Sequence, residues 1–169
     1  AYQSCTAPYV SVPDDSFMRI PSTPARTLSG LDVRVPDDFI GARNAVLFIF
    51  ERNHLVAVPA WQAVLQAALA DASAGFYILI PIDTAPAWRR PLTNWALRLE
   101  IADEATCEDT AVLWCNRRRW RAAVGLPGFN EPLLAIASPE GDIHAIAPGL
   151  PNPAVTPRLI SALGRTENQ

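Results

Sequence analysis

The chain contains no lysine, and all 14 of its basic residues are arginines. This absence excludes mechanisms that need a lysine amine, such as a Schiff base or a lysine general base. The longest uninterrupted apolar run, residues 45–50, is short, whereas a membrane-spanning helix needs about 20 residues. A net charge of −3 gives no overall attraction to nucleic acid or anionic lipid. We therefore expect neither a transmembrane segment nor a nucleic-acid partner.

Histidine and cysteine are also scarce. The two histidines, His54 and His144, lie far apart in the sequence, and no Cys-x-x-Cys pair occurs, so we expect no metal and no other cofactor. On an extended path Cys107 and Cys115 would be roughly 25 Å apart, beyond the ~5.5 Å between the Cα atoms of a disulfide. Cys5 could pair with either of them, which would indicate an oxidising compartment; the alternative is three free thiols.

Half of the 169 residues are hydrophobic, which is typical of a globular chain with a full core. Residues 1–26 differ, because they contain four prolines and show no helical or strand period. We expect them to form an extended arm whose apolar residues Tyr9, Phe17 and Met18 are buried against this domain or a partner. Residues 27–164 would form one domain and residues 165–169 a tail.

The first half of that domain has the pattern of parallel strands joined by a helix. Apolar and charged residues alternate over residues 31–35, which predicts a half-buried strand. Residues 45–50 and 76–83 are apolar enough for strands that are covered on both faces. The helical spacing of apolar residues over 61–73 places a helix between them. Strand, helix and strand in this order predict a right-handed parallel crossover.

The second half continues with helices and strands in alternation. Residues 88–99 predict a helix whose apolar face consists of Trp88, Leu92, Trp95, Ala96 and Leu99. The elements that follow are a strand at 110–115, an Arg-rich helix at 117–124 capped by Asn116, strands at 133–137 and 143–147, and a last helix at 156–164. This order predicts an α/β fold with a mixed central sheet of about five strands and helices on both faces.

Three segments resemble a known superfamily. They are the G-x-x-V-x-V-P segment at residues 30–36, the helix that opens near Trp61 in V-P-A-W, and the run W-R-A-A-V-G-L-P before the Glu131–Pro132 step. Residues 28–163 resemble the thioredoxin-like superfamily, in particular the peroxiredoxin-like branch that contains the mitochondrial ATP-synthase assembly factor and its bacterial relatives. The resemblance implies a three-layer sandwich and a cis Glu131–Pro132 bond.

In redox members of this superfamily the nucleophilic cysteine follows the first buried strand, at a helix N-terminus that lowers its pKa. Residues 51–58 occupy that place and contain neither cysteine nor serine. We therefore expect a non-catalytic binding module, acting as an assembly factor or accessory subunit of a membrane-associated complex. The alternative is a thiol-disulfide oxidoreductase or peroxiredoxin-like enzyme that uses Cys107 or Cys115. The resemblance favours the periplasm or another exported compartment, with mitochondria or cytoplasm as alternatives.

Two surfaces are candidates for binding. The residues expected to line the former redox groove are Glu51, Arg52, His54, Trp61, Glu131 and Pro132. In redox relatives this groove holds an extended peptide through backbone contacts at the X-Pro segment, so here it would be filled by the chain itself or hold a partner peptide without turnover. Arg117, Arg118 and Arg121 would form an anion or partner patch, although such runs are more often a solvated helix face.

Overall fold

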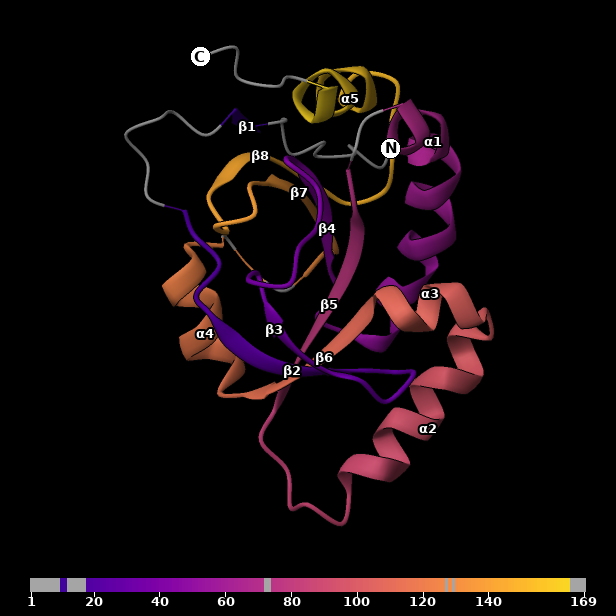
Figure 1. Ribbon diagram of the computed structural model, residues 1–169, viewed down its shortest axis with the longest axis vertical. Coiled ribbons are helices and arrows are strands. Elements are labelled where there is room, and N and C mark those ends of the chain that lie inside the picture. Colours follow the sequence, from indigo (N-terminus) through magenta and orange to yellow (C-terminus); the bar gives the residue numbers. More distant parts are fainter. Residues whose placement is uncertain (1–9, 12–17, 72–73, 127, 129, 165–169) are drawn as a thin grey trace, which may run out of the picture.

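A computed structural model describes residues 10–11, 18–71, 74–126, 128 and 130–164 (Figure 1). Its strands are β1 Val10–Ser11, β2 Thr23–Thr27, β3 Asp32–Val35, β4 Asn44–Phe48, β5 Phe76–Asp83, β6 Thr110–Cys115, β7 Leu133–Ala137 and β8 Ile143–Pro148. They form one mixed sheet in the order β1-β8-β7-β4-β5-β6-β2-β3. The β4–β5 and β5–β6 pairs are parallel and all other pairs are antiparallel. The mixed α/β sheet is confirmed, with more strands than the five or so expected.

The helices are the 3-10 helix η1 Arg52–Val56 and the α-helices α1 Ala57–Asp71, α2 Arg90–Ile101, α3 Glu104–Asp109, α4 Arg117–Val124 and α5 Thr156–Gly164. The sequence did not predict α3, which is short and begins where the Asp103 side chain accepts a hydrogen bond from the backbone N–H of Thr106 at 2.8 Å. The predicted cap of α4 is confirmed, because Asn116 Oδ1 accepts a hydrogen bond from the backbone N–H of Arg119 at 2.9 Å.

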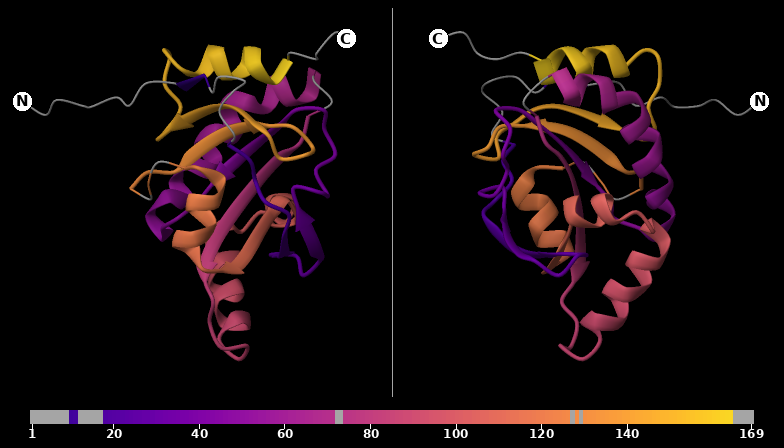
Figure 2. Two further views of the ribbon diagram at one scale, coloured as in Figure 1. Left: turned by 90° about the vertical axis from the view of Figure 1, so that its left-hand side faces the viewer. Right: turned by 45° about the vertical axis from the view of Figure 1, so that its right-hand side comes forward.

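The sheet has one hydrophobic core on each face, which makes the molecule a three-layer sandwich (Figure 2). Successive side chains of β4 point to opposite faces. Phe48 packs with Trp120 of α4 in one core, whereas Leu47 packs with Trp61 of α1 and Leu159 of α5 in the other. All residues of β4 are buried for this reason, as the unbroken apolar run predicts.

The last residues of the predicted arm are part of this architecture. Ile20 is 1% exposed, and its N–H donates a hydrogen bond to the carbonyl of Gly141 at 2.9 Å. Ile20 and the partly buried Met18 both pack in the core that contains Phe48 and Trp120, and β2 begins at Thr23. Tyr9 and Phe17 lie outside the described residues. The domain boundaries proposed from the sequence remain predictions.

The predicted cis bond at Glu131–Pro132 is wrong. Among the described residues the cis bond lies at Val35–Pro36, after β3. The trans isomer is the intrinsically preferred state of an X-Pro bond. Pro132 directly precedes β7, where its missing N–H costs no ladder hydrogen bond, and its carbonyl accepts a hydrogen bond from Gly149 at 2.8 Å. No helix in the described part of the chain is long and apolar enough to cross a membrane.

Candidate functional site

The candidate site lies at one edge of the sheet, where three parallel strands end together. β4, β5 and β6 run in the same direction, so their carboxyl ends meet at that edge. Arg117, at the start of α4, joins the three ends. Its backbone N–H donates to Asp83 Oδ1 at 3.0 Å, and its guanidinium donates to the carbonyl of Phe50 at 2.8 Å. The segment that leaves β4 is therefore fixed against the ends of its two neighbours.

η1 and the start of α1 form the segment in which the sequence resemblance predicted the position of a redox cysteine. The structure places His54 of η1 inside the protein, 4% exposed, with its backbone N–H bonded to the carbonyl of Glu51 at 3.0 Å. Neither ring nitrogen has a hydrogen-bond partner among the described residues. A buried polar group without a partner is rare and costs stability. His54 was predicted as a groove residue, but its side chain is part of the interior.

We expect His54→Leu to stabilise the protein, because it replaces an unpaired polar ring by an apolar side chain of similar size. The gain should be about 1–2 kcal/mol in the free energy of unfolding, measured by urea denaturation. His54→Gln is the matched control, since it keeps a buried polar group and should give no gain. A loss of stability in the leucine variant would show that the imidazole has a partner in the folded protein.

Three of the predicted groove residues are brought together through Gly149. Trp61 is fully buried, and its ring N–H donates to the carbonyl of Gly149 at 3.1 Å. The N–H of Gly149 donates to the carbonyl of Pro132. A Cβ atom at Gly149 would lie 3.5 Å from Glu131 Oε2, so the Glu131 side chain lies beside this glycine. Trp61 is thus a core residue that links α1 to the X-Pro segment, and Pro132 is buried with it.

The other two groove residues face solvent. Glu51 is exposed, and Arg52 forms an ion pair with Glu100 of α2. The Arg52 side chain is 79% exposed, and ion pairs in such surroundings contribute little stability. The pair nevertheless shows that this loop lies next to the C-terminal half of α2. The structure therefore divides the predicted set into a buried part, His54, Trp61 and Pro132, and an exposed rim.

Arg117 and Arg121 of the predicted basic patch contact backbone carbonyls. Arg121 donates to the carbonyl of Leu126 at 3.2 Å, as Arg117 does to Phe50. Arg118 and Arg119 are exposed, whereas Trp120 between them and Arg121 is buried. The solvent-exposed arginines of α4 are thus Arg118 and Arg119, and the two flanking arginines also support the loops after β4 and α4.

The two described cysteines are not bonded to each other and lie on different elements. Cys107 is buried on α3 between Leu28 and Val112, and burial raises the pKa of its thiol. Cys115 is half-buried at the end of β6, where burial and the charge of Asp83 raise the pKa of its thiol to about 11. Because the thiolate is the nucleophilic form, both environments suppress reactivity. Cys5 lies outside the described residues, and its pairing with either thiol remains a prediction.

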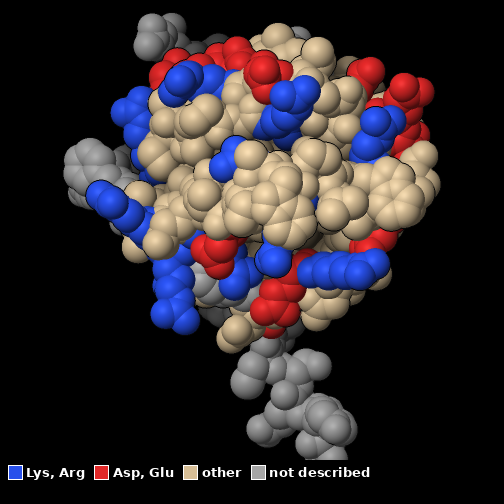
Figure 3. Space-filling model, turned by 90° about the horizontal axis from the view of Figure 1, so that it is seen from below, with Lys and Arg blue, Asp and Glu red and all other residues tan. Residues whose placement is uncertain are grey.

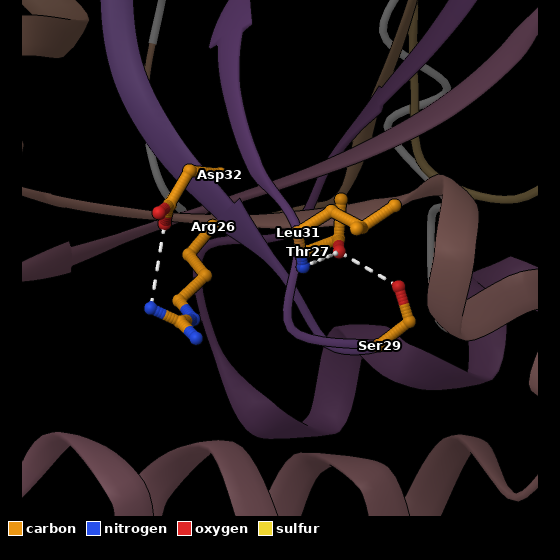
Figure 4. Close-up of polar contacts among 5 residues, drawn as sticks. All are labelled: Arg26, Thr27, Ser29, Leu31 and Asp32. Atoms are coloured by element: carbon orange, nitrogen blue, oxygen red, sulfur yellow. Dashed lines mark hydrogen bonds and ion pairs between the residues drawn. The ribbon is translucent and has the colours of Figure 1, made fainter.

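A cleft that the sequence did not reveal lies between α2 and the β2–β3 hairpin. Its volume is about 570 Å³, and Arg26, Asp32, Arg90, Asn94 and Trp114 are among the residues that line it. Arg26 and Asp32 face each other across the hairpin at 3.4 Å (Figure 4). The guanidinium of Arg90 lies over the Trp114 ring, 5.4 Å from its centroid. The cleft could not be predicted because β2 itself was not.

The turn beside this cleft is fixed by short-range hydrogen bonds. Thr27 Oγ1 accepts a hydrogen bond from the N–H of Leu31 at 2.9 Å and lies 2.8 Å from Ser29 Oγ (Figure 4). No group of histidine, cysteine and acidic side chains suited to holding a metal occurs in the described part of the chain.

No protein-family model matches the chain. No curated protein sequence matches it either. Among solved structures, a secreted thiol-disulfide isomerase from Corynebacterium glutamicum is similar with a TM-score of 0.60 at 9% identity, covering 97% of this chain and 94% of that one. BsSco, of the Sco family of cytochrome c oxidase assembly proteins, gives a TM-score of 0.59 at 12% identity, covering 86% and 91%.

A thiol peroxidase from Chromobacterium violaceum is similar with a TM-score of 0.53 at 15% identity, covering 86% of this chain and 83% of that one. At such identities the similarity establishes the fold and leaves the activity open. The sheet order, the two helical layers and these neighbours agree with the fold class predicted from the sequence. The chain has a thioredoxin-like fold of the kind shared by thioredoxin-like and peroxiredoxin-like proteins.

Proposed function

We propose that the protein is a non-catalytic thioredoxin-like binding module that acts as an assembly factor or accessory subunit of a larger, membrane-associated complex. One observation carries the proposal: the segment between β4 and α1 has no thiol, and it contains a buried histidine whose ring has no hydrogen-bond partner among the described residues. The described thiols lie elsewhere and have raised pKa values. The likeness to the ATP-synthase assembly factor family points in the same direction, as does a structural neighbour from an oxidase-assembly family.

Two exposed apolar side chains next to the site offer a surface to a partner. Val56 of η1 is 62% exposed, and Leu150, which follows Gly149, is 48% exposed. Val56 directly precedes α1, which carries Trp61, and Leu150 directly follows the glycine that Trp61 contacts. A partner polypeptide would cover these side chains, while the buried residues of the site keep the loop in place. An exported compartment fits this role, and one structural neighbour is a secreted protein.

We expect Val56→Asp combined with Leu150→Asp to reduce partner capture at least tenfold, because each carboxylate would have to be desolvated in the contact. The measurement is quantitative mass spectrometry of proteins cross-linked to the tagged chain in native membranes. Ile40→Asp, at a side chain that is 90% exposed between β3 and β4, is the matched control. Unchanged capture of the same partners by the double variant would move the interface away from this surface.

A thiol enzyme that uses Cys115 is the second candidate. β6 ends beside β5 with Cys115 opposite Asp83 in the register, at the same sheet edge as the loop after β4. This position favours Cys115 over Cys107, which is 3% exposed on α3. The high pKa of Cys115 opposes the idea, because only about one thiol in 10⁴ is ionised at pH 7 when its pKa is near 11.

The reactivity of Cys115 discriminates between the two functions. In the non-catalytic protein we expect the native thiol to react with a disulfide reagent at pH 7 about 100-fold more slowly than in denaturant, where an ordinary pKa near 8.5 returns. The Cys115→Ser variant shows which part of the thiol reaction belongs to Cys115. A native rate above the denatured rate, or insulin reduction or peroxide turnover that Cys115→Ser abolishes, would establish the enzyme and overturn the non-catalytic proposal.

A further inference from the structure

α2 is apolar on two opposite sides, and among the described residues one side packs against the cores while the other is largely exposed. Leu97 and Ile101 pack against the core clusters. The side chains on the other side are Trp88 (66% exposed), Leu92 (62%), Trp95 (63%) and Leu99 (61%). Trp88 lies in the turn that leads into α2, where Arg89 already has helical dihedral angles, φ −82° and ψ −25°. We call these four residues the α2 stripe.

Side chains of this kind are rarely left in water together. From below, the face that carries α2 shows a broad band of uncharged atoms bordered by arginines and acidic residues (Figure 3). Within that band the four side chains of the α2 stripe are large and apolar, and an exposed apolar patch commonly marks an interaction surface. A helix that is apolar on both sides is covered on both sides in its functional state.

The geometry points to a second copy of this chain as the partner, and we propose that the protein forms a twofold dimer through antiparallel pairing of α2. The residues of the α2 stripe are spaced by four, three and four, which is the spacing of the seam between two packed helices. Their order, Trp, Leu, Trp, Leu, becomes self-complementary when the helix is reversed. Leu92 then lies opposite Trp95 of the second copy, and Trp88 opposite Leu99.

Each layer of that seam contains one large and one medium side chain, which is the alternation that fills a helix interface evenly. A parallel pair would instead place each tryptophan against its own copy. The charged residues beside the seam are also compatible with the antiparallel arrangement. Arg89 would lie beside Ala96 of the second copy, and Arg98 beside Pro91, so arginines do not oppose each other along the seam.

The area is sufficient for association. Taking about 250 Å² for a tryptophan side chain, the exposed parts of the α2 stripe amount to roughly 500 Å² per copy. Two copies would bury about 1,000 Å², the lower limit of a specific interface. We therefore expect a dissociation constant in the micromolar range, as for a transient or ligand-supported dimer.

The first and last elements of the described part of the chain do not cover the α2 stripe. β1 and α5, the first and last described elements, lie at the end of the molecule opposite α2 (Figure 1, Figure 2). The loop after β4 lies next to α2, through the Arg52–Glu100 pair. A dimer would thus carry two loops close to its twofold axis, which would make the protein bivalent. The inference does not depend on the proposed function.

The test is sedimentation equilibrium of the full chain between 1 and about 500 μM, a range around the expected micromolar dissociation constant. The wild type should shift from the 18.4 kDa chain mass toward twice that value. Trp95→Glu should raise the dissociation constant at least 100-fold, because two carboxylates would enter the centre of the seam. Ile40→Glu, remote in sequence and highly exposed, should not change it. A wild type that remains monomeric throughout would overturn the proposal.

An exchange of sizes tests the antiparallel register. Trp95→Leu and Leu92→Trp should each weaken the dimer at least tenfold, since they create Leu–Leu or Trp–Trp layers. The double variant L92W/W95L should have a dissociation constant within threefold of the wild-type value, because every layer again contains one tryptophan and one leucine. Circular dichroism verifies that each variant is folded. Failure of the folded double variant to recover would exclude the antiparallel seam.

Discussion

Trp61→Ala is expected to lower the free energy of unfolding by about 3–5 kcal/mol, the range for removing a fully buried tryptophan. The side chain is 0% exposed in the core between α1, β8 and α5, so its loss leaves a large cavity. It also removes the hydrogen bond that the ring N–H donates to the carbonyl of Gly149. For a domain of this size the thermal midpoint should fall by roughly 6–20 °C, measured by calorimetry.

Trp61→Phe separates the two contributions. It keeps most of the apolar ring but cannot donate to Gly149, so the expected loss is about 1–2 kcal/mol. The difference between the alanine and phenylalanine variants then measures the packing of the ring. A loss of less than about 1 kcal/mol in the free energy of unfolding of Trp61→Ala would be close to that of a surface substitution. It would show that the ring does not hold α1 against the segment after β8.

Gly141→Ala should have a comparable effect for a different reason. Gly141 has a φ of +92°, and a Cβ atom there would lie 2.7 Å from the carbonyl oxygen of Ile20 and 2.7 Å from Pro36 Cγ. The backbone would have to move and would weaken the hydrogen bond from Ile20 to Gly141. We expect a loss of about 3–5 kcal/mol from the left-handed dihedral and the overpacking together.

Gly30→Ala is the matched control. Its φ is +101°, but the nearest atom to a new Cβ, Arg26 Nη2, is 4.0 Å away. Only the dihedral cost of about 1–2 kcal/mol should appear there. The two variants are compared by urea denaturation. Equal losses would show that the segment around Ile20 yields without cost and that it is not packed against the β7–β8 turn as described.

The sequence predicted those elements whose pattern reports local burial. β4 and β5 are apolar over most of their length, and the structure buries all of β4 and most of β5, as central strands covered on both faces require. α4 was found from its cap and from the spacing of Trp120 and Val124, both of which are buried. β2 was missed because its sequence, TPART, contains a proline and few strand-forming residues; it is a strand because β3 and β6 pair with it.

The candidate site was predictable by position but not by exposure. The order of elements placed residues 51–58 at the end of β4 and Pro132 before β7, and the structure agrees. Nothing local distinguishes the buried His54 from the exposed Arg52 two residues earlier, because burial there depends on how η1 turns into α1. For α2 the spacing of Trp88, Leu92, Trp95 and Leu99 correctly identified one apolar face of the helix. The spacing could not show that this face is exposed in the structure.

The position of β4 in the middle of the sheet has a consequence for synthesis on the ribosome. β4 pairs with β5 soon after it is made, but its other neighbour is β7, about 85 residues later in the chain. At about 5–20 residues per second, this delay lasts roughly 4–17 s. Throughout that time the nascent chain carries a largely apolar strand with one unpaired edge, which is a template for aggregation. Chains that stall before Leu133 are therefore the form of this protein most in need of a chaperone.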